Sequence, residues 1–275
     1  MRTFRFAFIA LATTAAACSN SPSTSDGGTD ASGEGSAMTF TQTGQIVDFS
    51  NPTSGIPNAT ISGGGSSVKS NAMGDYTLSV PQNTAYSMQV VGADSGTAYV
   101  SLNEQEWMLT GNANRGTTSF VSQATQGLLQ IVLPSTPNPA LAVMSVQVEA
   151  TGACAADAGG SDVTGATIVV PGLPVGDAGP SGGPVLVYFA GSPPVPTVSA
   201  TSVTAGLLPS AIIYNMPVAT AFNQVTVHHP TCTQKAFPVN DLTDPHIVYT
   251  GNVELQALGA APLPPTVSYI RVFLE

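Results

Sequence analysis

Residues 75–80 read Asp-Tyr-Thr-Leu-Ser-Val and decide the fold class, because apolar and polar side chains alternate along them without a break. Successive side chains of a β-strand point to opposite faces of a sheet, so this stretch sets an apolar row against a polar row. Gly74 stands directly before it and offers the positive φ that a tight turn needs. The stretch predicts a half-buried strand that follows a turn.

On both sides of this strand, short runs rich in β-branched and aromatic residues recur, separated by Gly, Pro and Asn. The other expected strands are residues 45–47, 59–62, 86–90, 117–122, 128–133, 144–149, 185–189, 211–214, 224–227 and 267–274. Residues 102–109 alone suggest a helix, of two turns at most. The pattern predicts an all-β protein.

Four short motifs in order carry a resemblance to a known family. They are Gly-Gln-Ile-Val-Asp at 44–48, Pro-Asn-Ala-Thr-Ile at 57–61, Gly-Asp-Tyr at 74–76, and Val80-Pro81 ahead of Tyr86. Over residues 42–95 the chain thereby resembles the carboxypeptidase regulatory-like domain, a small β-sandwich of the transthyretin-like type. The resemblance implies that fold and a structural or accessory role.

A fainter copy of this pattern recurs downstream, where residues 165–168 and 217–222 echo two of its segments. The Pro-rich residues 134–139 stand between the copies and predict a domain boundary. We therefore expect two transthyretin-like or immunoglobulin-like β-sandwiches in tandem. The first takes residues 39–135, including a connecting segment, and the second takes residues 139–275.

The first 38 residues predict an export signal and a tether. Residues 1–17 combine a positively charged start with an apolar run too short to span a bilayer, which is typical of a signal peptide. Residues 15–18, Ala-Ala-Ala-Cys, resemble the bacterial lipobox, which implies lipid attachment at Cys18. Ordinary cleavage after Ala-x-Ala is the alternative. Residues 18–38 are nearly all small or polar and predict a flexible linker.

These features predict an exported protein that its lipid holds to the bacterial envelope. Ser19, after the cysteine, resembles the pattern of lipoproteins sorted to an outer membrane, so we expect the outer membrane or the cell surface. Acylation of Cys18 would leave Cys154 and Cys232 to pair as a disulfide in an oxidising compartment. Two separate buried thiols are the alternative.

The charge balance excludes two classes of partner. Six Lys and Arg stand against 16 Asp and Glu, a formal net charge of −10 at pH 7. Nucleic acids and anionic membrane surfaces bind clustered cations, and this sequence has no such cluster. We expect no nucleic-acid partner, and a membrane link through lipid rather than through basic side chains.

The sequence contains no known catalytic, phosphate-binding, dinucleotide-binding or EF-hand pattern, so we assign no catalytic residue, metal or cofactor. A zinc site would draw on His228, His229 and His246, with Asp241 or Asp244. Adjacent strand residues point to opposite faces, so His228 and His229 would not easily ligate one ion. We expect surface histidines.

Trp107 is the single tryptophan and the one ligand-binding candidate. An exposed indole would stack on a sugar, whereas a buried one would anchor the central segment on a sandwich. We expect a non-enzymatic cell-envelope lipoprotein that acts as a structural or binding module, with an envelope protein or a glycan as its partner. The alternatives are a carbohydrate-binding accessory module of an extracytoplasmic degradative system and an envelope hydrolase.

Overall fold

The structure is a computed structural model, and it describes residues 38–49, 51–92, 98–131, 133–150, 154, 163–172, 183–190, 195–197, 199–204, 210–259 and 265–275. The predicted signal peptide, the lipid-bearing Cys18 and nearly all of the predicted linker lie outside the described residues. Residues Ala37–Glu275 form one compact unit. The described part of the chain contains no helix that is long and apolar enough to cross a membrane.

The described residues are mostly β-strand, which confirms the expected class. The first half of the chain contributes β1 (Thr39–Asp48), β2 (Asn51–Gly55), β3 (Thr60–Gly63), β4 (Ser66–Lys69), β5 (Asp75–Pro81), β6 (Gln89–Val91), β7 (Ser101–Glu104), β8 (Trp107–Leu109), β9 (Ala113–Phe120) and helix α1 (Gln123–Ile131). The second half contributes β10 (Ala142–Ala150), β11 (Thr167–Val169), β12 (Val185–Ala190), β13 (Val195–Thr197), β14 (Ala211–Met216), β15 (Ala219–Phe222), β16 (Thr226–His228), β17 (Val239–Asn240), β18 (Ile247–Tyr249), β19 (Val253–Leu255) and β20 (Thr266–Leu274).

Strand β5 has the alternation that its sequence predicts. Tyr76, Leu78 and Val80 are buried, and the side chains between them are exposed. Gly74 has a φ of 82°, so the turn before the strand is also confirmed. The apolar row of β5 therefore faces a core, as the period of two requires.

Two local predictions are wrong. Residues 102–109 form β7 and β8 rather than a helix, because β7 pairs in parallel with the distant β20 and β8 pairs with β18. Residues 128–133 fall largely within α1 rather than in a strand. The helix begins after Ser122, whose hydroxyl accepts a hydrogen bond from the backbone N–H of Thr125 at 3.2 Å, as an N-cap does.

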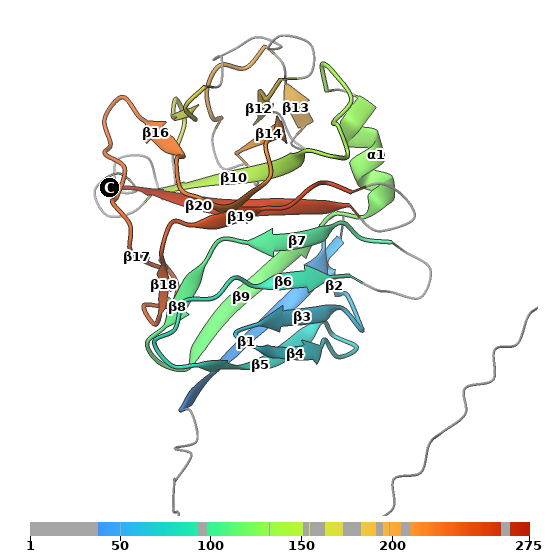
Figure 1. Cartoon of the computed structure of the whole chain (residues 1–275), viewed down its shortest axis with the longest axis vertical. Coiled ribbons are helices and arrows are strands. Elements are labelled where there is room, and N and C mark those ends of the chain that lie inside the picture. The colour runs from blue at the N-terminus through green and yellow to red at the C-terminus, as the bar shows by residue number, and fades with distance from the viewer. Residues whose placement is uncertain are drawn as a thin grey trace, which may run out of the picture. The chain divides into compact units, whose positions relative to one another are not determined.

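A nine-stranded sheet runs through both halves of the chain. Its strand order is β13-β12-β14-β10-β20-β7-β6-β3-β4, and Figure 1 shows β20 between β10 and β7. A four-stranded sheet of β2, β1, β5 and β9 and three smaller sheets complete the unit. Since strands from both sides of residues 134–139 join one sheet, the expected tandem arrangement is not confirmed.

Two large hydrophobic cores lie on this framework. The first packs residues of β1, β5 and β9 against β3, β6 and β8. The second packs residues of β10, β14 and β20 against β11, β16 and β19. Strands of the second half also enter the first core, because Val239, Ile247 and Tyr249 on β17 and β18 belong to it. The two cores therefore do not divide cleanly at one point of the chain.

We predict that Gly74→Ala destabilises the fold more than Gly65→Ala. Both glycines have a φ near +80°, which costs an alanine roughly 1–2 kcal/mol. A Cβ at Gly74 would also lie 2.1 Å from the carbonyl oxygen of Ile46, whereas one at Gly65 would meet nothing within 4 Å. Urea unfolding should show a free energy of unfolding about 2 kcal/mol lower for Gly74→Ala than for Gly65→Ala. Equal losses would contradict the close approach of this turn to β1.

Candidate functional site

A cavity of about 370 Å³ lies on one face of the nine-stranded sheet. Alternation along the central strands decides which residues reach it. On β10, Met144, Val146 and Val148 enter the second core, while Val143, Ser145 and Gln147 line the cavity on the opposite face. On β20, Ile270 and Val272 enter that core, while Val267, Tyr269 and Arg271 line the cavity. The cavity and the second core thus share one sheet.

The walls of the cavity come from both halves of the chain. Strand β9 belongs to the four-stranded sheet and supplies Arg115, Thr118 and Phe120. The apolar side chains around it include Phe49, Val100, Leu102, Val121, Leu133, Pro137, Phe189, Pro196 and Ile212. Its volume falls in the range of pockets that bind small molecules, and it has the usual mixture of an apolar lining and a few polar groups.

Arg115 forms the first polar group of the cavity lining. Arg115 is 5 % exposed, and Glu104 is also buried. The Nη2 atom of Arg115 lies 3.4 Å from Oε2 of Glu104. Burial alone would lower the pKa of Arg115, but the carboxylate of Glu104 holds that pKa above its ordinary value. The guanidinium also lies over the ring of Trp107, 5.0 Å from its centroid, in a cation–π geometry. Arg115 is therefore a fixed cation.

Arg271 forms the second polar group and is shared between two carboxylates. Its Nη1 donates to Oδ2 of Asp241 at 3.1 Å, and its Nε lies 3.5 Å from Oε1 of Glu149. Burial raises the pKa of Glu149, with Arg271 opposing that shift. Burial would raise the pKa of Asp241 as well, but hydrogen bonds from Thr243 and Tyr249 bring it below its ordinary value. Asp241 therefore holds its negative charge more strongly than Glu149 and is the main counterion of Arg271.

Several buried polar atoms near the cavity have no hydrogen-bond partner among the described residues. They include Nε of Arg115 and Oγ1 of Thr118, both on residues that line the cavity. Leaving a buried donor unpaired costs about 1–3 kcal/mol, so such groups in a native fold call for an explanation. A ligand or water in the cavity would supply the missing partner. The arrangement can bind a molecule, and we assign no reacting group to it.

Trp107 lies in the first core rather than on a surface. Its side chain is 0 % exposed, and its ring lies 5.7 Å from that of Tyr249 and 6.1 Å from that of Tyr86 (centroid to centroid). It has no exposed face on which a sugar could stack, so the geometry favours the core-anchor alternative. Trp107 contributes indirectly, because it supports the guanidinium of Arg115 at the cavity.

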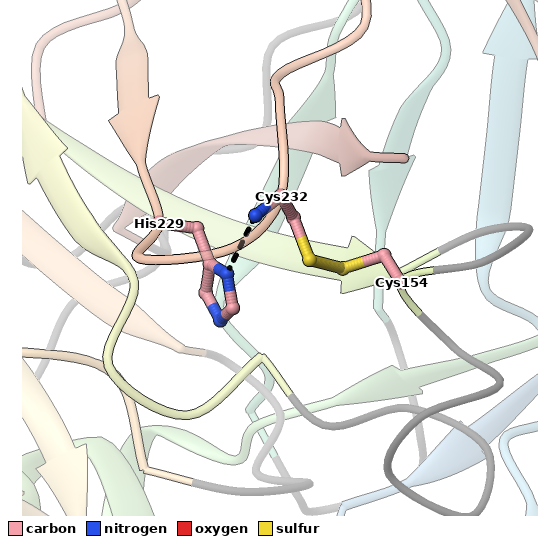
Figure 2. A group of neighbouring side chains, drawn as sticks. All are labelled: Cys154, His229 and Cys232. Carbon is pink, nitrogen blue, oxygen red and sulfur yellow. Dashed lines mark hydrogen bonds between the residues drawn. A yellow bond between two sulfur atoms is a disulfide. The ribbon is translucent and has the colours of Figure 1, made fainter.

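The histidines are not brought together. His228 is exposed at the end of β16, and His246 lies beside Gly111, near β8. His229 caps a turn, because its Nδ1 accepts hydrogen bonds from two backbone N–H groups. The donors are Thr231 at 3.2 Å and Cys232 at 3.1 Å, and Figure 2 shows the bond from Cys232. Asp241 binds Arg271 instead of a histidine.

The predicted disulfide is present between Cys154 and Cys232, with Cα atoms 5.8 Å apart (Figure 2). His229 lies close to both sulfurs, and the three side chains have the composition of a metal site. However, the two sulfurs are bonded to each other and are not thiolates, which are the form that binds metal. The group is therefore a structural crosslink, with His229 ordering the turn that carries Cys232.

Sequence reasoning missed the two arginines of the cavity. Arg271 is the single charged residue of β20, and Arg115 and Arg271 are two of only six Lys and Arg in the chain, so the rarity of cations was an available signal. What brings them to one cavity is the parallel pairing of β10 with β20 and the approach of β9, which no local pattern encodes.

Removing the disulfide should lower stability. Cys154 and Cys232 are separated by 78 residues, and a crosslink of that span stabilises by about 4 kcal/mol in the chain-entropy account. Cys154→Ser with Cys232→Ser should lower the free energy of unfolding by roughly that amount. Reductant should destabilise the unmodified protein to a similar degree and leave the double variant unchanged. An unmodified protein that is indifferent to reductant would contradict a crosslinked native state.

Comparisons with known proteins leave the family open. No protein-family model matches this chain, and no curated protein matches it. Among solved structures, the chain is similar to the Bacillus anthracis TIE protein, with a TM-score of 0.26 and 9 % sequence identity. The match covers 86 % of this chain and 33 % of that one, so the chain spans about a third of its length. A likeness at this level carries no argument about function.

Proposed function

We propose that this protein is a non-enzymatic binding module of the bacterial cell envelope, and that the cavity between β9 and the nine-stranded sheet holds its ligand. The single observation that carries the proposal is the cavity itself. It is largely apolar and is lined from both sheets. The buried Arg115, the partly buried Arg271 and polar atoms without a hydrogen-bond partner among the described residues lie along it. A purely structural module would have no need of such a space, which lowers packing density.

The lining favours a small ligand with an apolar body over a polysaccharide. Aliphatic and phenylalanine side chains surround the cavity, and Trp107, the residue expected to stack on a sugar, is fully buried. No partner protein is needed for a ligand of this size. The carbohydrate-binding alternative therefore has no specific observation in its favour.

The division of the fold into two β-sandwiches is also proposed. We infer that two transthyretin-like sandwiches share the nine-stranded sheet through β20 and β7, and that β17 and β18 from the second half of the chain complete the first of them. The separate hydrophobic cores support this interpretation, since each brings together strands on facing layers. The long sheet would then be a fusion of two smaller ones.

We also propose that the protein is attached to a membrane through lipid on Cys18. The disulfide between Cys154 and Cys232 is consistent with an exported protein, because such bonds persist in oxidising compartments. The chain has few cations that could bind an anionic membrane, so we propose that lipid on Cys18 links the module to the outer membrane or the cell surface.

The anchor is testable on the protein from a bacterial host. The full chain should lose residues 1–17, carry acyl groups on Cys18 by mass spectrometry, and partition into the detergent phase of Triton X-114. Cys18→Ser should enter the aqueous phase. Unmodified Cys18 at the new N-terminus would show ordinary signal cleavage instead and would remove the anchor from the proposal.

The cavity is testable with the neutral fluorescent probe N-phenyl-1-naphthylamine. The folded protein should enhance its emission saturably, because the ring system would enter the apolar cavity. Ile212 lines the cavity, so Ile212→Trp should fill the space and weaken probe binding at least tenfold. Met73→Trp, at a residue 62 % exposed on the first half of the chain, is the matched control and should bind as the unmodified protein does.

Two results would contradict the assignment of the cavity. One is an absence of enhancement by the unmodified protein. The other is equal enhancement by both tryptophan variants, which would place the probe elsewhere. Circular dichroism of each variant should confirm that it is folded before titration.

A further inference from the structure

The positive charges behind the cavity are offset by carboxylates before any ligand enters. Two guanidinium groups, Arg115 and Arg271, face three carboxylates, those of Glu104, Glu149 and Asp241. With every carboxylate ionised the group carries −1, and with Glu149 protonated it carries 0. In neither state do the arginines have positive charge to spare for an anion.

We infer that the ligand of the proposed binding function is an uncharged molecule with an apolar body and a hydrogen-bond-accepting oxygen, such as a ketone, ester or amide carbonyl, directed toward Arg115 and Thr118. This inference rests on the proposed function, since it names the ligand class of the same cavity. Two exclusions and one positive requirement carry it.

An anionic ligand is excluded by the charge count. A carboxylate that entered the cavity would leave water and find its candidate partners already neutralised by Glu104 and by Asp241. Burying a charge without a counterion is strongly unfavourable. The chain as a whole carries a formal −10 at pH 7, and this field also repels anions on approach.

A cationic ligand is excluded by the lining. Arg115 and Arg271 are the charged residues on the cavity surface in the described part of the chain, and none of the described lining residues is Asp or Glu. An ammonium group in the cavity would therefore approach two guanidinium groups before any carboxylate. Like charges in such surroundings repel.

The positive requirement is for an acceptor atom. Nε of Arg115 is a donor without a hydrogen-bond partner among the described residues, and a guanidinium cannot accept a hydrogen bond. Oγ1 of Thr118 is also unpartnered and can donate. A carbonyl oxygen has two lone pairs and can accept from both. It would satisfy the buried donors without adding charge.

The test compares ligands of similar length that differ in the head group. Nonan-2-one, octanoate, octylammonium and nonane are each used to displace N-phenyl-1-naphthylamine from the full folded protein at pH 7. Nonan-2-one should displace the probe at a concentration at least tenfold lower than either charged ligand requires. It should also be at least threefold more effective than nonane, because nonane cannot accept a hydrogen bond.

Two variants test the polar contact itself. Thr118→Val removes the hydroxyl with little change of shape, and because that hydroxyl has no hydrogen-bond partner among the residues that the structure describes, the fold should be retained. Arg115→Lys keeps a cation near Glu104 but removes the Nε donor and the planar fork. Each should reduce the advantage of nonan-2-one over nonane at least threefold. The control Thr77→Val, on the exposed face of β5, should leave that advantage unchanged.

The outcomes separate this inference from the proposed function. Strongest displacement by octanoate or by octylammonium would overturn the neutral-ligand inference while leaving the cavity as a binding site. The acceptor requirement would be overturned if nonan-2-one displaced the probe no better than nonane. It would also be overturned if the advantage of nonan-2-one persisted in Thr118→Val and Arg115→Lys. A protein that never binds the probe would overturn the proposed function itself.

Discussion

The parallel pairing of β20 with β10 on one side and β7 on the other is the interaction on which the rest of the structure depends. A strand in the interior of a sheet must be compatible with what lies on both of its faces. One face of β20 presents Ile270, Val272 and Leu274 to the second core. Its other face presents Tyr269 and Arg271 to the cavity and Phe273 to the first core. Both cores and the cavity therefore share this one strand.

The charged group around Arg271 follows from the position of β20 between the two cores. Arg271 stands where β20 passes between the two cores, so its guanidinium needs carboxylates from other elements, which β10 and the segment after β17 provide in Glu149 and Asp241. Tyr249 links this group to the aromatic stack, because its hydroxyl donates to Asp241 and its ring lies beside Trp107. Charged residues make up only 8% of this chain. Ion pairs with side chains as little exposed as these determine which elements must meet, whatever their net effect on stability.

How much of this the sequence could predict depends on the range of the interaction. The strand β5 and the turn at Gly74 are set by alternation and by backbone conformation over a few residues, so local patterns find them. Helix α1 was not predicted: Ser122 caps it, but Gly127 within it weakens the helical pattern, and residues 128–133 were expected to form a strand. By contrast, β7 is a strand because β20 pairs with it from more than 150 residues away, and no pattern within residues 102–109 carries that information.

The candidate site is harder to predict from sequence than the strands are, because residues of two different sheets line it. Arg115 comes from β9 in the four-stranded sheet, and Tyr269 comes from the nine-stranded sheet. A molecule in the cavity would touch both, so its binding would favour the arrangement in which the sheets are packed. Any ligand that binds only the folded state stabilises it by mass action, by about 2.7 kcal/mol at a hundred times its dissociation constant. The space between the sheets would then be where occupancy and the packing of the two halves are coupled.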